Sequence, residues 1–360
     1  MEKQIFHVLD KIEQAGYEAY LVGGYVRDHL LKIKTSDIDI CTNALPMDIC
    51  KIFENYAFTT TNYGNVSLNI NNLQIEITTY RKDFYKDSRR PKEVVYVYSL
   101  EEDLVRRDFT INAICMDKNG HVIDPLKARQ DLKKHLIKMI GDPSIRLVED
   151  PLRIMRAIRF ATTLKFRLDE ALKEAIYANR HHLKTLSYER KKEELTKIFA
   201  SRNKAYGLKL LKSLKLDEEL ELFNLDNVLL TDDLIGMWSS ICDTDKYPFT
   251  KNEKRIINEI KELINVPLDD NILYKYGIYP SMIACDLKKG NKRALLKRYD
   301  KLVIKDRNDI AITAKEICDL LHVEAGSLKS IYSDLEDAIL RRVVKNDLKS
   351  IKKYLAIKYL

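Results

Sequence analysis

The sequence of 360 residues is poor in cysteine, proline and glycine, with 6, 8 and 11 of them. The cysteines are scattered, with no Cys-x-x-Cys pair and no Cys/His spacing typical of zinc. We therefore expect reduced, mostly buried thiols and a cytoplasmic protein. There is no internal repeat, low-complexity tract or long Gly/Ser/Pro linker, so we expect parts that pack against one another.

Long hydrophobic runs are also missing. No apolar stretch approaches the ~18 residues that a membrane-spanning helix needs, so no membrane partner is expected. The first residues, MEKQIFHVLDKIEQAG, have the pattern of a charged amphipathic helix and not of a signal peptide. The net charge of +8 favours a polyanionic partner, and the length allows two or more domains.

The chain is organised around the stretch LVGGYVRDHLLKIKTSDIDI, residues 21–40. A strand is predicted over 36–41, on which Asp37 and Asp39 share one face. Adjacent carboxylates repel each other unless a cation lies between them, and their hard oxygens suit Mg²⁺. The alternative is a surface pair of aspartates.

A glycine turn precedes this strand. At Gly23 and Gly24 backbone N–H groups can approach an anion, and a helix predicted over 25–31 follows. An anion-binding turn next to a pair of metal-binding carboxylates indicates phosphoryl or nucleotidyl transfer. An ordinary strand–helix turn is the alternative.

The following region is rich in β-structure. Residues 66–70 and 73–78 alternate in polarity and predict a hairpin; Glu76, on its polar face, either completes the metal site or is solvated. Residues 80–91, YRKDFYKDSRRP, are predicted to be a mobile loop. After about residue 125 helical periodicity takes over, so we predict an N-terminal α/β head followed by a helical arm.

Two further motifs carry charge. Arg106-Arg107-Asp108 can clamp a triphosphate or hold a ribose hydroxyl, or form only a local surface ion pair. The second motif is EDPLRIMRAIRF, residues 149–160. In it, Asp150 is a candidate helix N-cap.

This second motif also places arginines along one helix face, at positions 153, 156 and 159. A fixed arginine can donate to the O2/N3 edge of cytosine or to N1 of adenine, while a fixed aspartate accepts from their amino groups. Uracil presents an oxygen to that aspartate, so such a pair can select C and A without a template. The helix at ERKKEEL, residues 189–195, is expected to steady this one.

Together these motifs resemble the class II tRNA nucleotidyltransferases and bacterial poly(A) polymerases, which belong to the polymerase-β-like superfamily. The likeness covers roughly the first 200 residues and includes LVGGYVRD with DID, IEITTYR (75–81), the loop at 80–91, RRDFTINAI (106–114), and the motifs at 149–160 and 189–195. It implies an α+β fold, with a mixed-sheet nucleotidyltransferase head and an all-helical neck, body and tail. We place these four parts at 1–138, 139–200, 201–270 and 271–360.

The resemblance also implies residue roles. Asp37 and Asp39 are the catalytic, metal-binding residues for two Mg²⁺ ions, and nucleotide binding falls to Gly24, Arg27, Arg107, Asp108, Asp150, Arg153, Arg156 and Arg159. Of these, Gly24 and Arg27 hold the triphosphate, Arg107 and Asp108 the ribose, and Asp150 and Arg153 the base, supported by Arg156 and Arg159. The implied substrates are CTP, ATP and the tRNA acceptor arm with its 3′ end.

The expected activity is addition of C, C and A to tRNA 3′ ends. Residues 61–66, TNYGNV, lack the GRRF of poly(A) polymerases, although Tyr63-Gly64-Asn65 departs from the usual His-Gly-Thr of CCA-adding members. The intact loop at 80–91 disfavours addition of CC alone, and no His-Asp phosphohydrolase motif follows in the C-terminal half.

Three alternatives remain open: an A-adding enzyme, a poly(A) polymerase, and a non-catalytic RNA-binding protein. Both monomer and homodimer are compatible with the sequence. In the C-terminal part, the basic helix patterns at 252–257 and 341–355 either meet RNA phosphates or form solvated faces.

Overall fold

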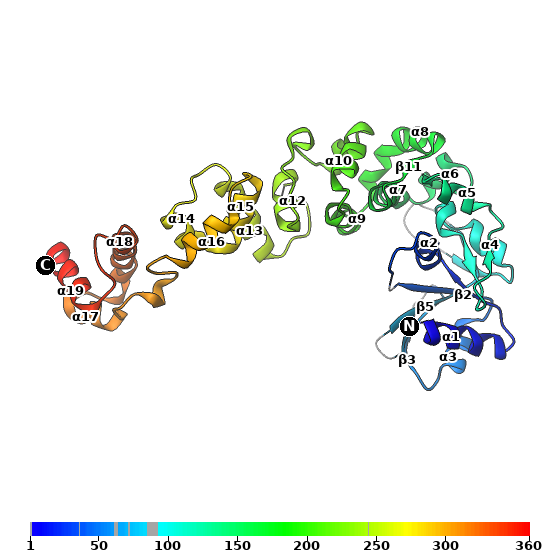
Figure 1. Ribbon diagram of the computed structural model, residues 1–360, viewed down its shortest axis with the longest axis horizontal. Coiled ribbons are helices and arrows are strands. Elements are labelled where there is room, and N and C mark those ends of the chain that lie inside the picture. Colours follow the sequence, from blue (N-terminus) through cyan, green and yellow to red (C-terminus); the bar gives the residue numbers. More distant parts are fainter. Residues whose placement is uncertain (1, 36, 61–63, 71–72, 85–92, 244) are drawn as a thin grey trace. The chain divides into compact units, whose positions relative to one another are not determined.

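The computed structural model describes residues 2–35, 37–60, 64–70, 73–84, 93–243 and 245–360 (Figure 1). Ser36, residues 61–63, Asn71-Asn72 and most of the predicted loop at 80–91 lie outside these ranges. The chain divides into two compact units, Met1–Leu222 and Phe223–Leu360.

The first unit is built on a mixed seven-stranded sheet with the strand order β3-β4-β5-β2-β1-β8-β9. Strand β2 runs parallel to β5, and every other pair of neighbours is antiparallel. The strands of the sheet are β1 (Ala19–Val22), β2 (Ile38–Thr42), β3 (Ala57–Thr60), β4 (Asn65–Ile70), β5 (Leu73–Thr79), β8 (Cys115–Met116) and β9 (Val122–Ile123). The hairpin predicted at 66–78 is confirmed as β4 and β5.

Apolar side chains fix the sheet against its helices. Helix α1 (Glu2–Gln14) buries Ile5, Val8 and Ile12 completely and is followed by Gly16 at a φ of +90°, the left-handed position that favours glycine. In β2, Ile38 and Ile40 are buried. The remaining helices before residue 113 are α2 (Gly24–Leu30), α3 (Pro46–Ile52), α4 (Leu100–Val105) and the 3₁₀ turn η1 (Thr110–Asn112).

Part of the predicted loop at 80–91 is a strand. Strands β6 (Arg81–Phe84) and β7 (Glu93–Tyr96) form a separate antiparallel ribbon, so the loop prediction is wrong for residues 81–84. Tyr80 is fully buried, and its hydroxyl donates to Glu18 at 3.1 Å. The sequence does not predict this strand, because the many charged residues of the segment remove the alternation of polar and apolar residues that indicates a strand.

The predicted change to helical structure near 125–140 is confirmed, and so is the α+β fold class. The elements that follow in the first unit are α5 (Ala128–Lys133), β10 (Leu136–Ile137), α6 (Pro143–Glu149), α7 (Leu152–Leu164), β11 (Arg167–Leu168), α8 (Glu170–Asn179), η2 (Arg180–Thr185), α9 (Tyr188–Ala200), α10 (Lys204–Ser213) and α11 (Leu216–Leu220). The expectation of an all-helical neck is corrected by β11, which lies within 139–200 and pairs in parallel with β10 at the end of the predicted head.

The second unit is helical in the residues that the structure describes. Its elements are η3 (Leu225–Asn227), α12 (Leu234–Ile241), α13 (Lys251–Leu263), α14 (Asp270–Tyr276), α15 (Ile278–Leu287), α16 (Lys292–Asp300), η4 (Arg307–Asp309), α17 (Ala314–Leu321), η5 (Ala325–Ser327), α18 (Leu328–Leu340) and α19 (Leu348–Tyr359). Trp238 is core, as predicted, and packs on Tyr247 and Phe249.

One prediction about the second unit is qualified by the structure. The basic segment predicted as helical over 341–355 is helical only from Leu348, because Asp347 caps α19 by accepting from the Ser350 N–H at 2.9 Å. The six cysteines are free thiols, four of them buried, in agreement with the sequence. Among the described residues, no helix is long and apolar enough to cross a membrane.

Candidate active site

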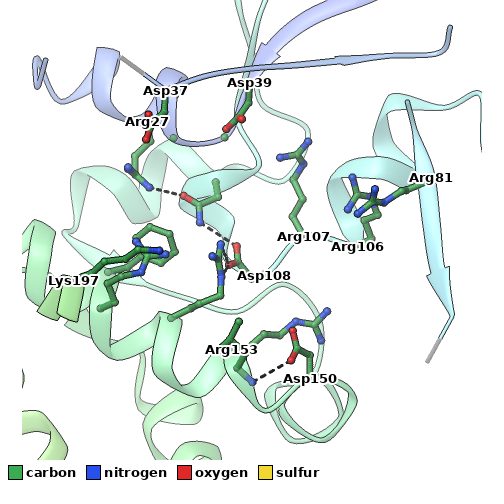
Figure 2. Close-up of a pocket in the computed structure, with 17 residues that line it drawn as sticks. Arg27, Asp37, Asp39, Arg81, Arg106, Arg107, Asp108, Asp150, Arg153 and Lys197 are labelled. Atoms are coloured by element: carbon green, nitrogen blue, oxygen red, sulfur yellow. Dashed lines mark hydrogen bonds and ion pairs between the residues drawn. The ribbon is translucent and has the colours of Figure 1, made fainter. Parts of the chain in front are cut away.

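A pocket of about 690 Å³ opens in the first unit, within the 300–1,000 Å³ typical of small-molecule sites (Figure 2). All ten site residues predicted from the sequence line it, together with Gly23, Arg81, Arg106, Asn112, Leu152, Phe160 and Lys197. In the view of Figure 2, Asp37 and Asp39 lie at one end and Asp150 and Arg153 at the other, with Asp108 between them.

The glycine turn between β1 and α2 is shaped by the neighbouring carboxylate. Gly23 has a φ of +73°, and a Cβ there would lie 3.0 Å from Asp39 Oδ2. Gly24 has no such restriction, since its Cβ would meet only Arg27 at 3.6 Å. Of the two positions, only Gly23 therefore requires glycine for its backbone conformation. Gly24 contributes its backbone to the pocket wall.

The two aspartates reach the pocket from the start of β2. The strand begins at Ile38, so Asp37 directly precedes it and only Asp39 is a strand residue, which corrects the predicted boundary. Asp39 stands beside Val22 on one side and beside Glu76 of the parallel strand β5 on the other.

The electrostatics of Asp39 fit a bound cation. Burial raises the pKa of this carboxyl, Glu76 and Asp37 raise it further, and Arg107 partly opposes them. A hard divalent cation between Asp37 and Asp39 would relieve this repulsion with the oxygen ligands that it prefers. Among the described residues there is no cluster of three or more His, Cys, Asp or Glu side chains placed to hold a metal, so this fit rests on the pair alone.

Asp103 organises the neighbouring arginines. It is fully buried and accepts from Arg106 Nε at 2.8 Å and from Arg107 Nη2 at 3.0 Å. Burial works to raise the pKa of Asp103, but the two guanidinium groups outweigh it and lower the value. The surface ion pair considered for Arg106-Arg107-Asp108 is therefore replaced by a pairing of both arginines with the buried Asp103.

Asp108 belongs to a different network. Its Oδ1 accepts from the Phe109 N–H at 2.8 Å and from Asn112 Nδ2 at 3.0 Å. Its Oδ2 accepts from Arg156 of helix α7 at 2.7 Å. Burial works to raise the pKa of Asp108, but Arg156 and these hydrogen bonds lower it to about 2, so the carboxylate is charged at neutral pH.

At the start of α7 the predicted N-cap is wrong, because Pro151 and not Asp150 occupies the N-cap position. Asp150 directly precedes the N-cap, and its side chain still accepts from the Leu152 N–H in the first turn, at 3.1 Å. Arg153 is buried and donates to the Arg146 carbonyl at 2.7 Å and to Glu149 at 3.0 Å.

The Phe160 ring lies against three of the arginines that line the pocket. The guanidinium carbons of Arg27, Arg156 and Arg159 lie 5.1, 5.3 and 4.0 Å from its ring centroid. Such cation–π contacts favour a fixed orientation of each arginine. Arg159 also donates to the buried Glu194 of α9 at 2.6 Å, which confirms that the helix at 189–195 steadies the arginine helix.

Comparison with known proteins identifies the family. Residues 19–138 match the poly A polymerase head domain, and residues 165–221 match a probable RNA- and SrmB-binding site of polymerase A. The chain is 33% identical to the CCA-adding enzyme of Bacillus pumilus over 380 residues, which cover 97% of this chain and 95% of that protein. The chain belongs to the CCA-adding enzyme and poly(A) polymerase family.

A second relative and a solved structure agree with this assignment. The CCA-adding enzyme of Ligilactobacillus salivarius is 34% identical, with 96% of this chain and 94% of that protein covered. The crystal structure of the Bacillus stearothermophilus CCA-adding enzyme in complex with CTP superposes with a TM-score of 0.87 at 26% identity, covering 99% and 97% of the two chains. This chain is accordingly a nucleotidyltransferase, and the resemblance inferred from its motifs is confirmed.

Within this nucleotidyltransferase, the sequence did not assign a role to five lining residues: Arg81, Asn112, Leu152, Phe160 and Lys197. The first four lie inside motifs that were recognised, Arg81 in IEITTYR, Asn112 in RRDFTINAI, and Leu152 and Phe160 in EDPLRIMRAIRF. Their place in these motifs was the available signal. Lys197 has no local pattern that separates it from other exposed cations.

Proposed function

We propose that this nucleotidyltransferase is a cytoplasmic CCA tRNA nucleotidyltransferase, which adds C, C and A to the tRNA 3′ end from CTP and ATP without a template. The observation that carries the proposal is the convergence of all ten predicted residues on one pocket. Full-length similarity to CCA-adding enzymes supports the choice of reaction.

In this proposal Asp37 and Asp39 hold Mg²⁺. Two ions held there would supply Lewis-acid activation of the attacking 3′-hydroxyl and charge neutralisation for the leaving pyrophosphate. The chain supplies the two carboxylates, Asp39 from strand β2 and Asp37 from the residue that directly precedes it. Arg107 and Arg27 place positive charge near Asp39.

The nucleotide would extend from this metal end along the pocket. The Gly24 backbone and the Arg27 guanidinium bind the triphosphate, since both residues line the pocket and Arg27 lies beside Asp37 in Figure 2. Arg107 and Asp108 then meet the ribose. A charged Asp108 accepts from a ribose hydroxyl, which favours NTP over dNTP.

The base would lie against the start of α7. Asp150 accepts from the amino group of cytosine or adenine, and Arg153 donates to the ring nitrogen or carbonyl beside it. Arg156 and Arg159 support this face, held by Asp108, Glu194 and the Phe160 ring. Uracil would turn an oxygen toward Asp150 and be rejected.

The acceptor would be the tRNA acceptor arm. The exposed cations Arg341, Arg342, Lys345, Lys349 and Lys353 and the half-buried Lys352 lie at the C-terminal end of the second unit. Double-stranded RNA is bound mainly through its backbone and shape, so this basic segment suits phosphate contacts. The four-part division into head, neck, body and tail belongs to the same proposal.

An incorporation assay tests the proposal. Purified protein receives Mg²⁺, single nucleotides, and tRNAs that lack CCA, CA or only the terminal A. We expect CTP to extend the first two tRNAs and ATP to extend the third. ATP incorporation restricted to the third tRNA would show an A-adding enzyme, long A-tails on unrelated RNA a poly(A) polymerase, and tRNA binding without incorporation a non-catalytic RNA-binding protein.

A further inference from the structure

Asn112 joins two parts of the pocket that are distant in sequence. Its Oδ1 accepts from Arg27 Nη1 at 2.8 Å, and its Nδ2 donates to Asp108 Oδ1 at 3.0 Å. The side chain is buried, with 7% of the residue exposed. One amide thus connects helix α2, next to the glycine turn, with the carboxylate that follows the arginine pair.

This double contact uses a property that is specific to an amide. The carbonyl oxygen accepts from a guanidinium while the NH₂ group donates to a carboxylate, so both partners are satisfied at once. An aspartate in the same place would accept from Arg27 but would repel Asp108. An apolar residue would leave both charged groups without this partner.

The contact also determines which oxygen of Asp108 faces the pocket-lining arginine. Oδ1 accepts from the Phe109 N–H and from Asn112 Nδ2. Oδ2 accepts from Arg156, whose Nε and Nη2 both lie 2.7 Å from it, so its partner is a side chain that lines the pocket. Asn112 therefore orients the carboxylate with Oδ2 toward the arginine face of the pocket.

We propose that Asn112 is a positioning residue that sets selection of ribose over deoxyribose. It does so by holding Asp108 in the rotamer that presents Oδ2 to a ribose hydroxyl. Through Arg27, the same amide ties this rotamer to the triphosphate end of the pocket. The inference rests on the proposed function, because it assigns the ribose to Asp108.

The test measures kcat/KM for CTP and for dCTP on tRNA that lacks CCA, in wild-type protein and in Asn112→Asp. We expect the CTP:dCTP ratio to fall at least about tenfold in the variant, the contribution of one charge-assisted hydrogen bond. The CTP:UTP ratio is expected to stay within about twofold, because base selection falls to Asp150 and Arg153. A general structural defect would lower all three rates together and leave both ratios unchanged.

Two further variants keep the test decisive. Asn112→Ala removes both hydrogen bonds without adding charge, and it replaces Asn112→Asp if that protein does not fold. Asn179→Asp is the matched control, since Asn179 Nδ2 also donates one hydrogen bond, to the Ala175 carbonyl at 2.9 Å, outside the pocket. Its CTP:dCTP ratio should equal that of the wild type.

The outcomes separate the inference from the proposed function. Wild-type protein that incorporates no CTP would overturn the proposed function. Active variants at Asn112 that keep the wild-type CTP:dCTP ratio would overturn the inference alone.

Discussion

Arg156 binds Asp108 at 2.7 Å, and this ion pair joins helix α7 to the segment that follows α4. The pair links the residue proposed to contact the ribose with the helix proposed to contact the base. Because the Asp108 side chain is only 10% exposed, the same contact contributes to stability and can be followed by its pH dependence.

The first prediction concerns acid stability. The pKa of Asp108 is about 2 in the folded protein, below the value of about 3.9 for an unfolded aspartate. A lowered pKa stabilises the fold above pH 4, and this stabilisation is lost as pH falls toward 2. Urea unfolding of the wild type should therefore lose about 2 kcal/mol more between pH 5 and pH 2 than Asp108→Asn does. Equal losses in the two proteins would contradict the lowered pKa.

The second prediction concerns the pair formed by Arg159 and Glu194. Glu194→Gln leaves the guanidinium half of a mostly buried pair without its counter-charge, so we expect a loss of about 3 kcal/mol in unfolding free energy. The neighbouring Glu193 is exposed, and Glu193→Gln should change stability by less than about 0.5 kcal/mol. Thermal and urea unfolding of both variants make the comparison. Similar stabilities would show that the pair is not needed.

The third prediction uses the two glycines of the turn. Gly23→Ala places a side chain at a φ of +73° and against Asp39, so we expect it to cost about 1–3 kcal/mol of stability. Gly24→Ala should cost less than about 1 kcal/mol, because its Cβ makes only an ordinary contact. The unfolding midpoints of the two proteins provide the measurement, and equal midpoints would contradict the strain at Gly23.

Local patterns predicted much of this fold and site. Strand alternation placed Asp39 opposite the core residues Ile38 and Ile40, and helical spacing placed the three arginines of α7 on the pocket. Both inferences require only neighbours within one element. The motif order then identified the family, because each motif supplies a different part of one nucleotide site.

Such local patterns do not predict contacts between residues that are far apart in the sequence. Asn112 meets Arg27 from 85 residues away, and Glu194 meets Arg159 from 35 residues away. Glu194 also pairs with Lys197 of its own helix at 3.7 Å, but its shorter contact, to Arg159 at 2.6 Å, comes from tertiary packing. The two-residue strands β10 and β11 are too short to show any period.

The fourth prediction separates the carboxylates at the metal end. Asp39→Asn should lower nucleotide incorporation at least about a thousandfold, because a neutral amide binds Mg²⁺ poorly, while tRNA affinity stays near the wild-type value. Glu76→Gln is the comparison, since Glu76 neighbours Asp39 in the sheet but does not line the pocket. We expect it to lose less than about tenfold. A loss as large as that of Asp39→Asn would make Glu76 a third ligand.

The fifth prediction concerns base selection at Asp150. In Asp150→Asn the amide oxygen can still accept from the Leu152 N–H, so this hydrogen bond at the start of α7 is retained. The new NH₂ group donates where the carboxylate accepted, and it therefore pairs with the O4 oxygen of uracil. We expect the UTP:CTP ratio of kcat/KM to rise about tenfold or more in single-nucleotide incorporation.

Asp142→Asn is the control for this change. Asp142 caps α6 by accepting from the Ser144 N–H at 2.8 Å and does not line the pocket. The same substitution there should leave the UTP:CTP ratio unchanged. If Asp150→Asn also keeps the wild-type ratio while retaining activity, Asp150 does not read the amino group of the base. Its side chain would then act only as the acceptor for the Leu152 N–H at the start of α7.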